Sequence, residues 1–285
     1  MNNLIKRTIS GVGFAVIMLA AFLTNKFVFG GVMLFALIVM MHEFLRMTCG
    51  NDYKYSQVLS IMAGVILFVL TFMYKGFGFP GRLVVLSFIP VFILMVNSLY
   101  VKDKSQFSKF ANLYTAILYI AVPWSLLNFA VFGPTGSFNG RLLLCFFCII
   151  WGSDVGAYCF GMALGQKYGK KLFPSISPKK SWIGFWGGML TSIAVSVTLY
   201  YTGLFPLESG QPIFNLIHCI AIAVLLDVAG VYGDLIESQW KRHYDIKDSG
   251  ALIPGHGGLL DRFDSALIAI PIGIIYLVAL DALAL

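Results

Sequence analysis

The sequence predicts an all-α, polytopic integral membrane protein with about nine transmembrane helices and a cytoplasmic N-terminus. Hydrophobic residues make up 59% of the chain and charged residues only 12%, which is too little charge for the surface of a soluble domain. Long unbroken apolar runs such as LLLCFFCIIW indicate helices, because a membrane β-barrel would show short segments of alternating hydrophobicity. We therefore expect a single transmembrane domain over residues 1–285.

Apolar runs define the expected spans, since a helix needs about 20 apolar residues to cross a bilayer. They lie near residues 8–24, 27–45, 56–73, 83–100, 111–132, 141–164, 182–201, 213–238 and 263–281. Lys6 and Arg7 precede the first run, but no small-residue cleavage site clearly follows it. We interpret this run as a retained span and not as a signal peptide.

The basic residues of the loops predict the orientation, because cytoplasmic loops carry the excess of Lys and Arg. Sixteen of the 20 basic residues fall in one set of alternate loops. The other set holds only Lys26, Lys75, Arg82 and Arg141. This distribution predicts a cytoplasmic N-terminus and, with nine spans, an external C-terminus. The net charge of +7 then follows membrane topology, which favours anionic lipid over nucleic acid as a partner.

Several acids lie inside or at the edge of the apolar runs, where a charge costs about 2.5 kcal/mol or more. They are Glu43, Asp154, Asp227, Asp234 and Glu237. Asp227 and Asp234 are two helical turns apart and share one face of the eighth span. Glu237, Ser238 and Lys241 continue this polar face towards the next loop.

Two of these acids lie in other runs. We interpret Glu43, at the cytoplasmic end of the second run, as a topology or packing residue that snorkels to water or pairs with Arg46. Asp154 lies early in the stretch WGSDVGAYCFGMALGQKYGKK and needs a cation, which could be Lys, Arg or a metal ion. Glycines at four-residue spacing in this stretch indicate close helix packing. They are Gly161, Gly165 and Gly169.

The longest predicted cytoplasmic loop, KRHYDIKDSGALIPGHGGLLDRFDS, covers residues 241–265 and is dense in acids, bases and glycine. Its glycines would let backbone N–H groups approach and cradle an anion. These are Gly255, Gly257 and Gly258.

Two acids follow the glycines. Asp261 and Asp264 are three residues apart, on one side of the first turn of the last helix. With Asp234 they would form an oxygen-rich cluster, which suits Mg²⁺ with bound phosphates and not zinc. In the alternative interpretation, both acids only cap the helix and pair with Arg262 and Lys247.

A second candidate site lies in PSISPKKSWIG, residues 174–184. We predict Ser177 as the N-cap and Pro178 as the first residue of the seventh span. Lys179 and Lys180 beside a helix N-terminus would make an anion site suited to phosphate. Alternatively, the two lysines only determine the topology.

The run from Ser238 to Asp264 contains S-x-x-K-R, K-D-S-G, P-G-H-G-G and L-D-R-x-D-S in this order. It resembles the signature of the phosphatidate cytidylyltransferases, also called CDP-diacylglycerol synthases. The upstream segments S-D-x-G-A-Y and S-P-K-K-S also match this family. The resemblance covers the C-terminal half, residues 141–285, where the catalytic motifs lie, and the first five spans by hydropathy only.

This resemblance implies transfer of the cytidylyl group of CTP to phosphatidic acid, giving CDP-diacylglycerol and pyrophosphate in phospholipid biosynthesis. It implies a required divalent metal ion, with the family's metal ligands at Asp234 and Asp261. The oxygen-rich donor set makes Mg²⁺ the expected cofactor, in a one- or two-cation site. The expected partners are CTP, phosphatidic acid and membrane lipid but no nucleic acid, and a homodimer is the assembly considered. The expected location is the bacterial cytoplasmic (inner) membrane, with the active site facing the cytoplasm.

The predicted site follows from the residue analysis and the resemblance together. The catalytic residues are predicted to be Asp234, Lys247, Asp261 and Asp264, with Asp154 as a further metal ligand. The substrate-binding residues are predicted to be Ser177, Lys179, Lys180, Lys241, Arg242, Lys247, Asp248, Gly255, His256, Gly257, Gly258 and Arg262.

No Ser, Cys or His nucleophile is needed, because the lipid phosphate attacks and the protein supplies positioning and charge neutralisation. One alternative is a CTP-dependent polyprenol or lipid kinase, which would transfer the γ-phosphoryl group. The D-G-x-x-A-R type motif of the CDP-alcohol phosphotransferases is absent. An ion-coupled transporter is the non-enzyme alternative, but the sequence shows no pair of broken helices in two related halves.

Overall fold

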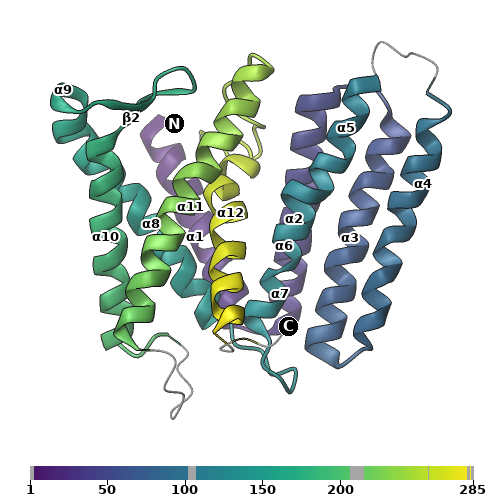
Figure 1. Ribbon diagram of the computed structural model, residues 1–285, viewed down its shortest axis with the longest axis horizontal. Coiled ribbons are helices and arrows are strands. Elements are labelled where there is room, and N and C mark those ends of the chain that lie inside the picture. Colours follow the sequence, from purple (N-terminus) through teal and green to yellow (C-terminus); the bar gives the residue numbers. More distant parts are fainter. Residues whose placement is uncertain (1–2, 102–106, 206–214, 256, 281–282, 284–285) are drawn as a thin grey trace. The chain divides into compact units, whose positions relative to one another are not determined.

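The computed structural model describes residues 3–101, 107–205, 215–255, 257–280 and 283, and most of them are helical (Figure 1). Eight helical segments in the described residues are long and apolar enough to cross a membrane. They are Lys26–Cys49, Lys54–Phe77, Gly81–Ser98, Phe107–Val131, Arg141–Tyr168, Trp182–Tyr201, Leu216–His243 and Leu260–Ala279. Each overlaps one of the predicted runs, so the prediction of an all-α, polytopic membrane protein is confirmed.

The first predicted run lies in α1 (Asn3–Leu23). Its apolar part, Arg7–Leu23, is shorter than the eight segments above. A total of nine spans and a cytoplasmic N-terminus therefore stay predictions.

The chain forms two compact units. Unit 1 consists of Met1–Asn128, Phe132–Phe138 and Tyr244–Phe263, and unit 2 of Phe129–Val131, Asn139–His243 and Asp264–Leu285. The boundary passes through the last helix, α12 (Leu260–Ala279), whose residues 260–263 belong to unit 1. The prediction of a single transmembrane domain stays a prediction.

Unit 1 begins with α1, α2 (Lys26–Cys49) and α3 (Lys54–Phe77). The side chain of Asn25 caps α2 by accepting hydrogen bonds from the N–H groups of Phe27 and Val28. A 3₁₀-helical segment, η1 (Gly81–Ser87), then leads into α4 (Phe88–Ser98). Buried phenylalanines from the first three helices form much of the core; they include Phe22, Phe29, Phe44 and Phe68.

The fifth predicted run is not one regular α-helix. It consists of α5 (Phe107–Ala116), the π-helical turn η3 (Ile117–Ala121), α6 (Val122–Ser125) and α7 (Leu127–Val131). Pro123 lies next to the π-helical turn and has no N–H to donate, which accounts for the irregular hydrogen bonding. Trp124 ties this region to α2, because its Nε1 donates to the carbonyl oxygen of Met33 at 2.8 Å.

Unit 2 contains α8 (Arg141–Phe160), the π-helical turn η4 (Gly161–Gly165) and the short helix α9 (Gln166–Tyr168). The strands β1 (Lys171–Phe173) and β2 (Ser177–Ser181) pair antiparallel and lie beside α9 at one end of α10 (Trp182–Tyr201) (Figure 1). The unit ends with α11 (Leu216–His243) and residues 264–279 of α12.

Glycines allow α8 and α10 to pack closely. A Cβ on Gly156 would lie 2.9 Å from the carbonyl oxygen of Gly187, and one on Gly184 would lie 3.0 Å from that of Ala157. A Cβ on Gly161 would contact the Cα of Gly184 at 3.7 Å. The prediction that glycines here serve close helix packing is therefore confirmed for Gly161. Gly156 of α8 makes a similar close contact with α10.

We expect Gly156→Ala to lower the free energy of unfolding by about 1–3 kcal/mol, because the new methyl group would collide with the side chain of Thr191 and the carbonyl oxygen of Gly187, both in α10. Gly31→Ala in α2 is the matched control, since a Cβ there has nothing within 4 Å. Thermal unfolding of both variants in the same detergent measures the difference. Equal melting temperatures would contradict the close packing of α8 on α10.

Candidate functional site

The segment before α10 differs from the predicted helix start. Ser177 is not an N-cap, because residues Ser177–Ser181 form β2, in which Ser177 pairs with Phe173 and Ser181 with Lys171. The N-cap of α10 is Ser181, whose Oγ accepts a hydrogen bond from the N–H of Gly184 at 3.2 Å. The prediction was wrong because pairing with β1 holds residues 177–181 extended, and Pro178 is compatible with an edge strand.

The lysines of this segment therefore lie on a strand and not on the first helical turn. Successive side chains of a strand point to opposite faces, and Lys179 is exposed whereas Lys180 is partly buried. The carbonyl oxygen of Lys179 accepts a hydrogen bond from Gln166 Nε2 at 2.7 Å, which fixes β2 against α9. The backbone thus holds both lysines in place without a helix N-terminus.

Unit 2 contains a cavity of about 450 Å³. Its polar lining residues include Ser153, Asp154, Lys179, Lys180, Ser181 and Asp234. These residues come from α8, β2 and α11, and the lining also includes apolar residues such as Ala157 and Phe185. The structure thus brings together four residues of the predicted site, namely Asp154, Lys179, Lys180 and Asp234.

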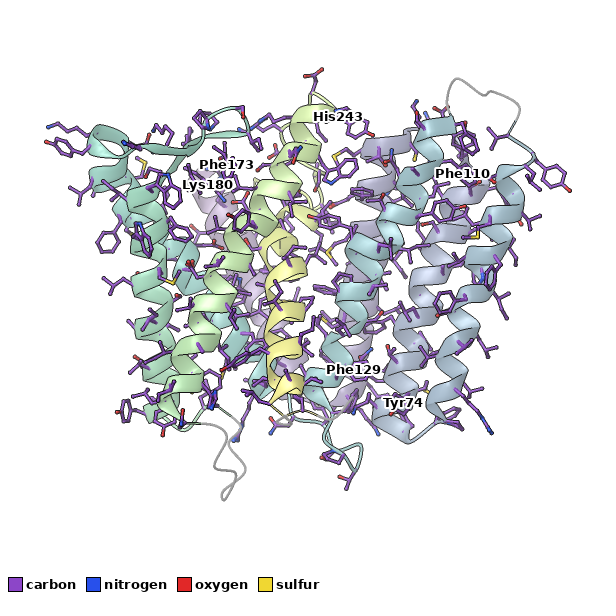
Figure 2. All side chains as sticks on the ribbon, in the orientation of Figure 1. Tyr74, Phe110, Phe129, Phe173, Lys180 and His243 are labelled. Atoms are coloured by element: carbon purple, nitrogen blue, oxygen red, sulfur yellow. The ribbon has the colours of Figure 1, made fainter. Side chains whose placement is uncertain are left out.

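Two of the lining residues form an ion pair. Lys180 Nζ lies 2.7 Å from Asp234 Oδ2, and Ser238 Oγ donates to Asp234 Oδ1 at 3.1 Å. Lys180 lies at the same end of unit 2 as His243, the last residue of α11 (Figure 2). The ammonium group of Lys180 offsets the charge of Asp234 at the edge of an apolar helix.

Further charged residues lie near this pair. Asp264, in α12, is close enough to Asp234 and Asp154 for their charges to interact. Glu237 is fully buried and forms an ion pair with Lys241, one turn further along α11. The i, i+4 contacts of α11 confirm the predicted polar face.

The acid of that face that lies farthest from the following loop, Asp227, has a different environment. It is 1% exposed, and Ser153 Oγ donates a hydrogen bond to its Oδ1. Ser153 also lines the cavity, so its hydrogen bond to Asp227 orients a hydroxyl of the cavity wall. Arg242, near the end of α11, contacts the residue that precedes β2. Its Nε donates to the carbonyl oxygen of Ile176 at 3.4 Å.

In unit 1, Asp261 lies in the first turn of α12 and accepts three hydrogen bonds through Oδ2. The donors are the N–H of Gly258 at 2.7 Å, the N–H of Ser249 at 2.9 Å and the Oγ of Ser249 at 3.0 Å. These contacts tie the K-D-S-G segment to the start of α12. They also bear out the alternative that Asp261 caps backbone groups at this helix start, a role that is compatible with a further role in catalysis.

Glu43 is the residue that the sequence interpretation missed. It is only 7% exposed, so it does not snorkel to water. Its Oε1 accepts from the N–H of Leu259 at 3.0 Å and its Oε2 from the N–H of Leu260 at 2.9 Å. Ser249 Oγ also lies 3.2 Å from Oε2. The interpretation failed because these partners are far away in the sequence, whereas Arg46 is only one helical turn away.

The glycines of the loop leave space for these two carboxylates. Gly257 has a φ of +86°, and a Cβ there would lie 2.7 Å from Asp261 Oδ2. A Cβ on Gly258 would lie 2.5 Å from Glu43 Oε2. The N–H of Gly258 points to Asp261, so the predicted cradle for an external anion is taken at this position by a carboxylate of the protein itself.

The other predicted residues of this loop are placed as follows. The side chains of Lys247, Asp248 and Arg262 are exposed. Gly255 has its carbonyl oxygen bound by Arg7 Nε of α1 at 2.9 Å. His256 lies outside the described residues, so its predicted role stays a prediction.

Comparison with known proteins shows to which family this chain belongs. A model of the cytidylyltransferase family matches residues 5–280, almost the whole chain. The chain belongs to the cytidylyltransferase family. The match includes α1 and the other N-terminal helices, which the sequence interpretation related to the family only by hydropathy.

Several relatives carry the name phosphatidate cytidylyltransferase. The one from Bacillus subtilis (strain 168) is 32% identical over 282 residues, which cover 95% of this chain and 96% of the relative. The one from Staphylococcus haemolyticus (strain JCSC1435) is 31% identical over 241 residues, or 84% of this chain and 87% of the relative. The one from Staphylococcus aureus (strain COL) is 31% identical over 236 residues, or 82% of this chain and 84% of the relative.

Mg²⁺, the divalent ion expected from the sequence, fits the donor chemistry of the cavity. In the parts of the chain that the structure describes, no three His, Cys, Asp or Glu side chains are grouped to hold a metal ion. Mg²⁺, however, commonly keeps several waters and uses one or two carboxylates plus substrate phosphates. Asp154 and Asp234 offer such oxygens at the cavity. The ligand roles of Asp154, Asp234 and Asp261 stay predictions.

We expect Ser181→Ala to destabilise this cytidylyltransferase by about 1 kcal/mol, because it removes the side-chain cap of α10. Ser177→Ala is the matched control, since Ser177 lies within β2 and caps no helix. Thermal unfolding in detergent measures both effects. A larger loss from Ser177→Ala than from Ser181→Ala would restore the helix start predicted from the sequence.

Proposed function

We propose that this chain is a phosphatidate cytidylyltransferase, which transfers the cytidylyl group of CTP to phosphatidic acid and produces CDP-diacylglycerol and pyrophosphate. The observation that carries the proposal is the cavity of unit 2, where Lys179, Lys180, Asp154 and Asp234 lie together in a member of the cytidylyltransferase family. The relatives of that name match this chain over most of their length.

In the proposed reaction, an oxygen of the lipid phosphate attacks the α-phosphorus of CTP. A new P–O bond forms, the bond between the α-phosphorus and its bridging oxygen breaks, and pyrophosphate leaves with that electron pair. The attacking oxygen is already an anion, so the protein needs no nucleophile and no base to create one. Its task is to bring two anionic substrates together and orient them.

The lysines of β2 suit this task. Two cationic side chains at one cavity attract phosphate groups and offset the repulsion between the substrates. The contact with Asp234 orients the ammonium group of Lys180 at the cavity, while the exposed Lys179 can reach a ligand from the other face of the strand. We assign Lys179 and Lys180 to the triphosphate of CTP.

We assign Asp234 and Asp261 as the ligands of Mg²⁺, with Asp154 as a third acid; this assignment rests on the sequence signature. When bound, Mg²⁺ would neutralise charge on phosphate oxygens. The hydrogen bonds from Ser238 and Lys180 orient Asp234. Those from Ser249 and Gly258 orient Asp261. Each carboxylate is thus held in one orientation by its own unit.

The distribution of basic residues supports a site that faces the cytoplasm, where CTP is present. The matched relatives are bacterial, which supports the cytoplasmic (inner) membrane as the location. Phosphatidic acid would reach the site from the bilayer, and CTP from the aqueous side.

Purified protein in detergent, supplied with labelled CTP, phosphatidic acid and Mg²⁺, should form a CDP-lipid and release one pyrophosphate for each lipid formed. Thin-layer chromatography of the lipid and a pyrophosphate assay measure the two products. Release of CDP with a phosphorylated lipid would instead show a kinase. Absence of any reaction in micelles, with ion uptake in sealed vesicles, would favour a transporter.

Asp234→Asn and Asp261→Asn should each lower kcat by about 100-fold or more, because each removes a carboxylate that we assign to Mg²⁺, whose charge would offset that of the reacting phosphates. Asp52→Asn is the control: Asp52 is an exposed acid of unit 1 whose partner is Lys109 at 2.8 Å. The initial rate of CDP-lipid formation, measured on folded protein, decides. Near-normal turnover in either variant would overturn its metal assignment.

A further inference from the structure

We propose that Glu43 is a positioning residue for the active site: its carboxylate anchors the start of α12 and so fixes the place of Asp261. This proposal rests on the proposed function, because it concerns the residue that we assign to Mg²⁺. The contacts that carry it, from Glu43 to Ser249, Leu259 and Leu260, lie within unit 1.

The first argument is the geometry of the contact. The first N–H groups of an α-helix have no partner within the helix and must be satisfied from outside. Here Glu43 accepts the N–H of Leu259 with one oxygen and that of Leu260 with the other, at 3.0 and 2.9 Å. A carboxylate that binds two successive N–H groups fixes both the position and the direction of the helix start, which a single hydrogen bond would not do.

The second argument is burial. Glu43 is 7% exposed, and Leu259 and Leu260 are 6% and 0% exposed. Water is therefore not available to replace the carboxylate, and a buried N–H that loses its acceptor is strongly unfavourable. The negative charge itself is stabilised by the positive end of the helix dipole. The anchor is thus part of the folded arrangement and not an incidental surface contact.

The third argument is that Glu43 and Asp261 share a partner. Ser249 Oγ lies 3.2 Å from Glu43 Oε2 and 3.0 Å from Asp261 Oδ2. A hydroxyl has one proton and donates to one of the two carboxylates at a time. Any movement of Glu43 therefore changes the hydrogen bonding of Asp261 through Ser249 as well as through the helix backbone.

The space around the two carboxylates supports the same conclusion. A Cβ on Gly258 would lie 2.5 Å from Glu43 Oε2, and one on Gly257 would lie 2.7 Å from Asp261 Oδ2. A Cβ on Gly250 would lie even closer to Glu43 Oε1. Glycines thus surround both carboxylates, and larger residues at these positions would push the two acids away from the helix start.

Glu43→Ala and Glu43→Gln test the proposal in the full-length protein, with His42→Gln as the control because His42 is the exposed neighbour of Glu43 on α2. Hydrogen–deuterium exchange of peptides that cover residues 247–262 reports the anchor directly. We expect exchange in Glu43→Ala to be about tenfold faster or more, since each lost acceptor removes a buried hydrogen bond. Glu43→Gln keeps one acceptor oxygen and should lie between Glu43→Ala and the wild type.

Kinetics separates positioning from general destabilisation. A displaced Asp261 should lower kcat on the order of 10- to 100-fold while the KM for CTP changes by less than about threefold, because the lost interaction acts in the transition state. Loss of folded protein alone would lower the rate in proportion to the folded fraction and leave exchange in the remaining fraction unchanged. If Glu43→Ala does not fold, Glu43→Gln decides.

The outcomes distinguish this proposal from the proposed function. If the wild type forms no CDP-lipid, the function is wrong, and exchange still decides whether Glu43 anchors α12. If the wild type forms CDP-lipid but both Glu43 variants keep its exchange and its kcat, Glu43 is not a positioning residue. An equal change in His42→Gln would assign the effect to the end of α2 in general and would also overturn the proposal.

Discussion

The start of α12 must find acceptors for its first N–H groups in a place where Leu259 and Leu260 are buried, and this requirement shapes unit 1. In a membrane protein such groups cannot rely on water, so the chain must supply the acceptor itself. Glu43 does so from α2, and Asp261 does so for Gly258 and Ser249. The loop between α11 and α12, the second helix and the candidate metal ligand Asp261 are thereby joined in one hydrogen-bonded arrangement.

The need for partners of buried polar groups also explains how the acids of unit 2 are paired. Asp234 is paired with Lys180, Glu237 with Lys241, and Asp227 with the hydroxyl of Ser153. An acid in an apolar helix is costly unless a cation or donor accompanies it. Lys180 comes from β2 and Ser153 from α8, so these two polar contacts also fix how β2 and α8 lie on α11. The glycines between α8 and α10 bring those two backbones close together.

The arrangement suits a reaction whose difficulty is the meeting of two anions. Lysines on β2 supply positive charge at the cavity without a nucleophilic side chain, and the acids beside them are the proposed Mg²⁺ ligands. A member of the cytidylyltransferase family needs little more from the protein than rigid placement of these groups, since CTP and the lipid carry the reacting atoms. The hydrogen bonds that orient the side chains of Asp234, Asp261 and Ser153 provide this placement.

The sequence by itself determined the membrane class, the places of the long apolar helices, the polar face of α11 and the family signature. It could do so because hydropathy, helical periodicity and motif spacing are local properties, so that Asp234 and Ser238 must meet wherever the helix lies. Only the tertiary structure decided that Ser181 and not Ser177 caps α10, since pairing with β1 keeps Ser177 extended. It also decided that Glu43 turns away from Arg46 and binds the start of α12, because that contact joins segments distant in sequence and depends on how the helices pack.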